Sequence, residues 1–366
     1  MIAEMIRKLA ARLMKHPAAP YHEHEVRSEV ERICEEHQLP FERDQFGNVL
    51  VRWRTDARQR PIVLAAHLDH PGFELMYARP ANARLARFRG GVPEGYFRRG
   101  IPLRLMPGKI PARLGRRKDK PGLFELETNS NDGRGPGFLP RFAVWELEDF
   151  AVRRGQIHGR SCDDLIGVAA ILAALIDLKR RRARVDVFGL ISRAEEVGFH
   201  GALACSASGL LPAKSLVISL ETSRELPGVK MGKGVILRVG DRTSIFDPEA
   251  TRFLAAIASD LAASKKGFQF QRGLMSGGTC EATAFQEFGF QTTAVCIALG
   301  NYHNCAPGMR IAAEYVNIAD ARGMVDLLVH AAEQMRHYKD LIGKLPRRLK
   351  EMLRDARKDL RATAEA

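Results

Sequence analysis

Between residues 157 and 222, carboxylates stand at one end of an apolar run three times. Asp163 and Asp164 precede one apolar run, Glu195-Glu196 follows a second, and Glu221 follows a third. In an open α/β sheet, ligands collect at the carboxyl ends of the strands, so acidic residues placed there converge on one point. Converging carboxylates repel one another unless a cation lies between them. This segment therefore predicts an α/β fold with a metal site.

The composition is that of a globular protein with a substantial core, since 45% of the 366 residues are hydrophobic. The six cysteines form no C-x-x-C pair, which argues against a disulfide framework and against a structural zinc finger. The first 16 residues have helical periodicity and not the apolar run of a signal peptide, and no segment approaches the roughly 20 apolar residues of a membrane span. We expect a cytoplasmic protein without a membrane partner.

The net charge of +14 is concentrated in one segment. Residues 84–120 contain twelve lysines and arginines against only Glu94 and Asp119. Such a patch can attract nucleic acid or an acidic partner. Because the segment has no known binding motif, a solvated surface is the favoured interpretation and a nucleic-acid partner is not expected.

Sequence patterns divide the chain into three parts. Alternating helical and strand patterns in 1–72 and 155–338 predict one catalytic α/β domain. Glycine, proline and short apolar bursts replace helical periodicity in 73–154, which predicts an inserted all-β domain that serves oligomer contacts or substrate access. Residues 339–366 form a basic tail with apolar residues at helical spacing, typical of a docking helix.

Two histidines also stand where predicted strands stop. His67 follows the buried strand 61–66, and His303 follows the strand 292–299. Side chains alternate along an extended segment, so Asp69 points to the same side as His67. A ligating histidine usually donates its other ring N–H to a carboxylate, and Asp69 is expected to be that acceptor.

Two imidazoles with several carboxylates suit zinc, cobalt or manganese. Enough ligands exist for two ions, and Asp163 is the expected bridge. His67 and Glu196 are assigned to the first ion, and His303 and Glu221 to the second. Paired metals lower the pKa of a shared water and polarise a scissile carbonyl.

Glu195, next to a ligand but not itself one, is the expected general base. It would take the proton of that water and pass it to the leaving amine.

The order of these motifs resembles the co-catalytic metallo-aminopeptidases of the glutamyl and deblocking type, which include the tetrahedral aminopeptidases. The matching segments are His67-Leu-Asp69-x-x-Gly-Phe, Cys162-Asp163-Asp164-x-Ile-Gly, Glu195-Glu196-Val-Gly-x-x-Gly201-Ala, Gly277-Gly-Thr279 and the late His303. The resemblance implies a phosphorylase/hydrolase-like three-layer domain with a central mixed sheet and an inserted small β-barrel. It also implies two divalent metals, removal of N-terminal residues from peptides, and a homo-oligomer ranging from a dimer to a dodecamer.

The chain departs from the family pattern at four positions. Glu221 stands where the family usually has aspartate, His70 replaces an acidic residue, Leu165 an arginine and Cys280 an aspartate. Because related deacylases and carboxypeptidases use glutamate at the first of these, a related amide hydrolase remains an alternative to an aminopeptidase. A non-catalytic scaffold that binds an acidic partner through the basic insert is a third hypothesis.

Overall fold

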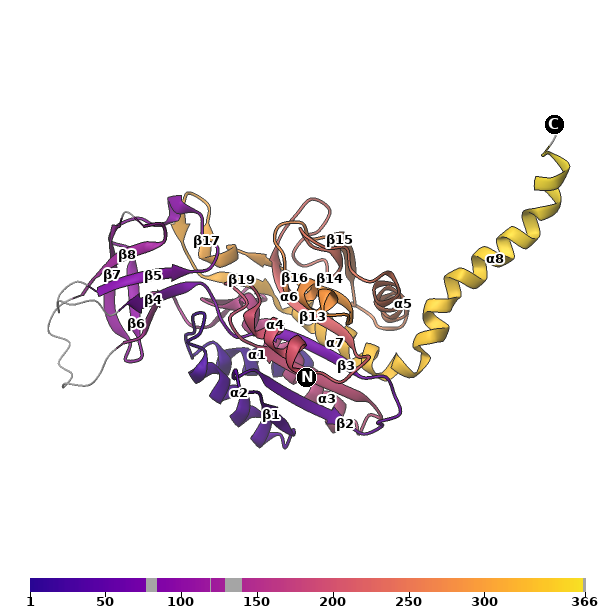
Figure 1. Cartoon of the computed structure of the whole chain (residues 1–366), viewed down its shortest axis with the longest axis horizontal. Helices are drawn as coiled ribbons and strands as arrows, with labels where there is room; N and C mark the ends of the chain where they lie inside the picture. Colours follow the sequence, from indigo (N-terminus) through magenta and orange to yellow (C-terminus); the bar gives the residue numbers. More distant parts are fainter. Residues whose placement is uncertain (77–83, 119, 129–139, 365–366) are drawn as a thin grey trace.

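A computed structural model describes residues 1–76, 84–118, 120–128 and 140–364. Parts of the predicted insert, at 77–83, 119 and 129–139, lie outside the described residues. Figure 1 shows a barrel at one end of the molecule, a large sheet with its helices in the middle, and a long C-terminal helix at the other end.

The main sheet has eleven strands and mixed direction. In spatial order its path is β1 (Phe41–Arg43), β2 (Val49–Arg54), β12 (Asp186–Ser192), β3 (Ile62–His67), β13 (Leu216–Arg224), β16 (Gln291–Gly300), β19 (Glu314–Asn317), β11 (Gln156–Gly159) and β10 (Ala151–Arg153). Beside β16 the sheet continues through β14 (Val235–Gly240) and β15 (Phe270–Leu274). The central strands β12, β3, β13 and β16 run parallel, so their carboxyl ends share one edge.

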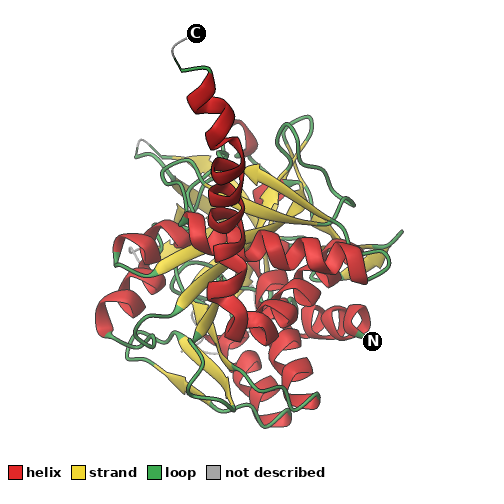
Figure 2. Ribbon diagram, turned by 90° about the vertical axis from the view of Figure 1, so that its right-hand side faces the viewer, coloured by secondary structure: helices red, strands yellow, loops and turns green. Residues whose placement is uncertain are grey.

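Helices cover both faces of this sheet, which makes three layers (Figure 2). One face packs against α1 (Ile2–Leu13), α2 (His24–Glu36), α3 (Cys162–Arg180), α5 (Pro248–Ser264) and α7 (Ile318–Gln334). The other packs against the shorter α4 (His200–Ser208) and α6 (Glu281–Glu287). Alternation along β3 serves both cores, because Leu64 packs on the first face and Val63 and Ala65 on the second.

Within the described part of the insert, six strands close into a barrel. They follow one another around it as β4 (Gly72–Met76), β5 (Arg84–Arg89), β8 (Leu123–Glu127), β7 (Ile110–Arg117), β6 (Pro102–Met106) and β9 (Phe142–Trp145). An aromatic cluster around Phe73 and Trp145 fills the interior. The barrel ends at Trp145, earlier than the predicted boundary at 154, because β10 pairs with β11 on the main sheet.

Short elements complete the chain. They are η1 (Glu94–Tyr96), η2 (Tyr302–Asn304), η3 (Met335–His337), β17 (Cys305–Ala306) and β18 (Arg310–Ile311). The chain ends in α8 (Tyr338–Ala362), which projects away from the body. Among the described residues, no helix is both long enough and apolar enough to cross a membrane.

One local expectation differs from the structure. Glu221 lies within β13 and not beyond its end, since β13 continues to Arg224. Pairing with β3 and β16 extends the strand past the apolar run that signals it.

Candidate metal centre

The register of the parallel strands positions the acidic residues. Ser192, the last residue of β12, pairs with His67, the last residue of β3. On the other side of β3, Ser219 of β13 pairs with Ala65, so Glu221, two residues further on, lies beside His67. The ends of β3, β12 and β13, which are far apart in the sequence, therefore lie at one edge of the same sheet.

Around His67, three carboxylates approach the same imidazole nitrogen region. His67 Nε2 lies 3.7 Å from Asp163 Oδ1 and 3.9 Å from Glu195 Oε2. Single ligand atoms of His67, Glu195 and Glu221 all lie within 4.8 Å of one another. Ligands 2.0–2.2 Å from a shared tetrahedral zinc ion stand ~3.3–3.6 Å apart. The 3.7 Å between His67 and Asp163 is close to that spacing, and the other separations are longer.

A second group forms around His303, which η2 presents after β16. His303 Nε2 lies 3.1 Å from Glu196 Oε1 and 3.7 Å from Asp163 Oδ2. The two oxygens of Asp163 thus each face a different histidine. This is the arrangement that a bridging carboxylate requires.

The structure groups the predicted ligands differently from the expected pairing. Glu221 belongs with His67, and Glu196 belongs with His303. The reason is geometric: β13 is the direct neighbour of β3, and the consecutive side chains of Glu195 and Glu196 diverge, the first toward His67 and the second toward His303. Predicting this pairing requires the strand register, which the motifs do not specify.

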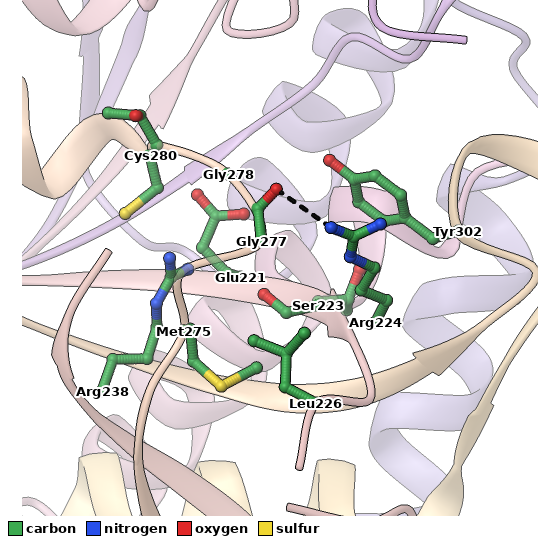
Figure 3. Close-up of a pocket in the computed structure, with 12 residues that line it drawn as sticks. Glu221, Ser223, Arg224, Leu226, Arg238, Met275, Gly277, Gly278, Cys280 and Tyr302 are labelled. Atoms are coloured by element: carbon green, nitrogen blue, oxygen red, sulfur yellow. Dashed lines mark hydrogen bonds between the residues drawn. The ribbon is translucent and has the colours of Figure 1, made fainter. Parts of the chain in front are cut away.

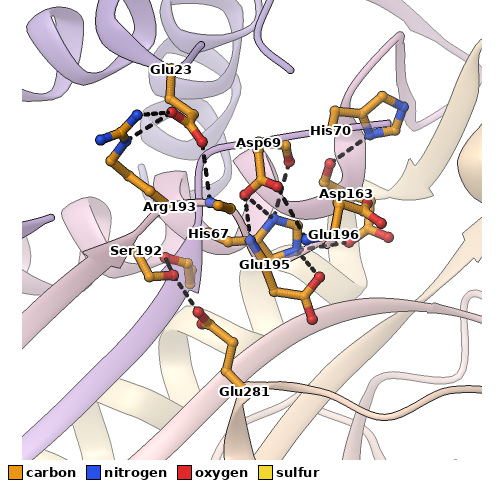
Figure 4. Close-up of polar contacts among 12 residues, drawn as sticks. Glu23, His67, Asp69, His70, Asp163, Ser192, Arg193, Glu195, Glu196 and Glu281 are labelled. Carbon is orange, nitrogen blue, oxygen red and sulfur yellow. Dashed lines mark hydrogen bonds and ion pairs between the residues drawn. The ribbon is translucent and has the colours of Figure 1, made fainter. Parts of the chain in front are cut away.

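Asp69 is buried beside His67, and its carboxylate is the more distant of the two Asp69 acceptors that face the ring (Figure 4). The ring Nδ1 of His67 is 3.0 Å from the backbone carbonyl of Asp69, and the carboxylate Oδ1 is 3.6 Å away. The carboxylate instead accepts the backbone N–H groups of Glu195 at 2.9 Å and Glu196 at 3.1 Å. Asp69 therefore fixes the turn that carries both glutamates.

The charges in this cluster are not balanced by the protein alone. Burial raises the pKa of Glu221 to about 8, and burial together with the neighbouring carboxylates raises the pKa of Glu195 well above its usual range. Burial disfavours the charged imidazole of His303, but Glu196 and Asp163 outweigh it and raise its pKa to about 9. Protons must therefore compensate the acidic groups when no other cation is present.

The donor set fits divalent metal ions. Asp163 Oδ1 and Glu221 Oε1 are buried and accept no hydrogen bond from a described residue. Buried carboxylate oxygens without partners are costly unless they coordinate a cation. Imidazole nitrogen and carboxylate oxygen are the ligands that borderline divalent metals take at catalytic sites.

Six of the predicted residues line one pocket of about 630 Å³. They are His67, Asp163, Glu195, Glu196, Glu221 and His303. The seventh, Asp69, is buried behind it.

Sequence reasoning missed a residue that supports both groups. Glu314, at the start of β19, accepts the backbone N–H of Asp163 at 3.0 Å and that of His303 at 2.8 Å. The backbone carbonyl of Gly91, next to the barrel strand β5, accepts from His303 Nδ1 at 2.7 Å. Neither residue belongs to a motif, and only their spatial position connects them with the site.

Of the four residues that depart from the family pattern, Glu221 lines the metal pocket and the other three do not. His70 is buried, with Nδ1 2.9 Å from the backbone carbonyl of Asp163 and Nε2 3.0 Å from the side-chain oxygen of Asn304. Leu165 is packed in the core of α3, and Cys280 lines a neighbouring pocket. None of them displaces a predicted ligand.

Comparison with solved structures identifies the fold. The TET1 peptidase of Pyrococcus horikoshii is 21% identical, with a TM-score of 0.72 over 91% of this chain and 99% of that one. An aminopeptidase from Desulfurococcus kamchatkensis is 23% identical, with a TM-score of 0.72 over 93% and 98%. A TET aminopeptidase from a marine-sediment thaumarchaeon is 19% identical, with a TM-score of 0.74 over 92% and 99%.

The sequence model of the M42 glutamyl aminopeptidases matches residues 141–327, which is half of the chain and includes all the acidic residues of the pocket. With this match and the shared fold, the chain belongs to the M42 glutamyl aminopeptidase family and is a peptide hydrolase.

Proposed function

We propose that this protein is a dinuclear aminopeptidase that removes an N-terminal residue from peptides. The observation that carries this proposal is the position of Asp163, whose two carboxylate oxygens face His67 and His303 at 3.7 Å each. One ion would be held by His67, Asp163 and Glu221, and the other by Asp163, Glu196 and His303. Zinc suits these ligands best, and cobalt or manganese are also compatible.

In the proposed hydrolysis, the metal ions and the protein side chains have separate roles. Two divalent ions held here supply a water of lowered pKa and polarise the scissile carbonyl. Glu195 is buried on the His67 side of the pocket, and its raised pKa suits a group that accepts a proton from water and returns it to the leaving amine. Asp69 keeps Glu195 in place through the backbone contact described above.

A second pocket, of about 380 Å³, adjoins the metal centre and supports a choice of substrate (Figure 3). The two pockets share Glu221, Thr279 and Tyr302. Arg224 and Arg238 line the second pocket. Its one acidic lining residue is Glu221, whose carboxylate would be bound to the proposed metal ion. The pocket is therefore positively charged next to the reacting centre.

Arg238 gives stronger evidence for an anionic substrate group than Arg224 does. It is only 3% exposed, and its Nε–H has no hydrogen-bond partner among the described residues. Burial lowers the pKa of Arg238, but nearby groups that include Glu221 and Asp241 raise it. Because a metal ion would engage Glu221, a substrate carboxylate could bind this buried guanidinium with charge-assisted hydrogen bonds. We infer that the pocket accepts the acidic side chain of an N-terminal glutamate or aspartate.

The aminopeptidase proposal is tested by comparing free and blocked substrates. Purified, zinc-loaded protein should hydrolyse glutamyl-p-nitroanilide and should not hydrolyse its N-acetyl derivative. Metal content measured on the same sample should approach two ions per chain. Preferential cleavage of the acetylated substrate, or release of a C-terminal residue from a blocked peptide, would instead assign the related amide hydrolase reaction.

The role of Arg238 is tested by substitution. Arg238→Gln should lower kcat/KM for glutamyl-p-nitroanilide about 10- to 100-fold, because hydrogen bonds to charged groups contribute ~1.5–3 kcal/mol. The rate with leucyl-p-nitroanilide serves as the internal control and should be retained, since a neutral side chain does not use the guanidinium. An equal loss with both substrates would show that Arg238 acts on the fold and not on specificity.

The basic insert gives less support to a scaffold that binds acidic partners. Several of its cations already pair within or near the barrel, including Arg89 with Glu74, Arg99 with Glu127 and Arg117 with Glu94. We propose that the barrel serves subunit contacts or substrate access in a homo-oligomer. The P. horikoshii relative, described as assembling into a tetrahedron or a large octahedral shell, supports this assignment.

A further inference from the structure

Helix α8 carries an apolar stripe that the rest of the chain leaves uncovered. Only Tyr338 and Leu341, in its first turn, are buried. From there the helix leaves the body, as both views show (Figures 1 and 2). Five large apolar side chains beyond that turn are each between 47 and 58% exposed, and they are Leu345, Leu349, Met352, Leu353 and Leu360.

These five side chains lie on one side of the helix. At 100° per residue they fall within a sector of about 100°, together with Ala356. In proteins most helical stability comes from packing an amphipathic face, so a stripe of this kind indicates a partner surface. The helix lies beyond residue 327, where the match to the family model ends.

Charges border the stripe with opposite sign on its two sides. In the last three turns one side carries a basic row of Lys350, Arg354, Arg357 and Arg361, and the other an acidic row of Glu351, Asp355 and Asp359. The two rows touch only at one exposed contact, between Arg354 and Asp355 at 3.4 Å. The other charges of the rows form no ion pair with a described residue.

This pattern is complementary to itself in one orientation. When two identical helices pair in parallel about a two-fold axis, the left side of each stripe faces the right side of the other, so basic rows meet acidic rows. In an antiparallel pair, like sides meet and like charges oppose each other. An anionic membrane would attract the basic row but repel the acidic row that borders the same stripe.

We propose that α8 is a self-association helix that pairs in parallel with α8 of a second copy of this chain. The stripe from Leu345 to Leu360 forms the contact, and the two charge rows set the orientation. The proposal does not depend on the hydrolase activity, since α8 contributes no residue to either pocket at the metal centre.

Cysteine cross-linking of the full chain tests both the pairing and its direction. In a parallel pair Leu360 lies opposite its own copy, so Leu360→Cys should form a disulfide-linked dimer under mild oxidation, seen on a non-reducing denaturing gel. In an antiparallel pair residue 360 lies opposite the start of the stripe and cannot reach its copy. Lys358→Cys, on the back of the same turn, is the matched control and should remain at the level of the unmodified chain.

Reversing the charges beside the stripe is an independent test of the parallel orientation. One variant changes all four residues of the basic row to glutamate, so that both borders are acidic, and the other changes all three residues of the acidic row to lysine, so that both are basic. Each of these variants alone should lose the Leu360→Cys cross-link, and an equimolar mixture of the two should recover it. Equal cross-linking of Leu360→Cys and Lys358→Cys, or sedimentation of the unmodified protein with phosphatidylserine vesicles without any cross-link, would overturn the proposal.

Discussion

Replacing Glu195 with glutamine is expected to abolish most peptide hydrolysis while leaving the bound metal in place. Glutamine keeps the size of the side chain but cannot accept the proton from the attacking water, and a general base contributes about 10²–10⁴-fold to the rate. We therefore expect kcat to fall by roughly that factor. The measurement is steady-state hydrolysis of glutamyl-p-nitroanilide, with metal content determined on the same preparation.

Metal analysis is needed because Glu195 lies close enough to His67 and Glu221 to act as a ligand. If Glu195→Gln lost a metal ion along with activity, the residue would be a ligand and the general base would have to be sought elsewhere. Glu287→Gln, the same chemical change at an exposed position of α6, is the matched control and should keep wild-type rates. Wild-type hydrolysis by Glu195→Gln would exclude Glu195 from proton transfer.

Removing the metal is expected to destabilise the fold, and increasingly so as the pH rises. In the metal-free protein the pKa of Glu221 is raised to about 8 and that of Glu281 to about 7, both by burial. The folded state then holds protons that the unfolded chain has already released above its ordinary carboxyl pKa near 4.5. This contribution to stability is complete below pH 4.5 and is lost as the pH rises to about 8.

His303 acts in the same direction. Its pKa is raised from 6.5 to about 9, so its contribution is also lost with rising pH, through about 9. Bound divalent ions replace these protons, and each ion at 100 times its Kd stabilises by ~2.7 kcal/mol. Thermal unfolding of chelator-treated and zinc-loaded protein, followed from pH 5 to pH 9, should show a gap in Tm that widens with pH. A gap that is absent, or that narrows over this range, would contradict a buried metal centre at these carboxylates.

The sequence predicts which residues form the site better than it predicts which glutamate lies beside which histidine. Each of the pocket residues stands at or near the end of an apolar run, and the parallel strands do bring those ends to one edge. Which glutamate serves which histidine depends on β13 lying directly beside β3, a contact between segments about 150 residues apart in the chain. Local pattern carries no information about that neighbour.

Two other residues near the site could not be predicted from the sequence. Arg238 and Glu314 each look like an ordinary charged residue of a half-exposed strand. They are buried because β14 and β19 flank β16 in the sheet. The helices α1, α2, α5 and α7 have a helical period of apolar residues, whereas α3 is buried nearly all round and the short α4 and α6 depend on packing against the sheet.

The hydrogen bond from His303 to the carbonyl of Gly91 makes the barrel a structural part of the reaction centre. A displacement of the barrel by a fraction of an ångström would tilt the imidazole and change its basicity, because that carbonyl fixes which ring nitrogen carries the proton. If the barrel serves subunit contacts and His303 binds a metal ion, as proposed above, a shift at a subunit contact would reach the metal centre through this single backbone oxygen.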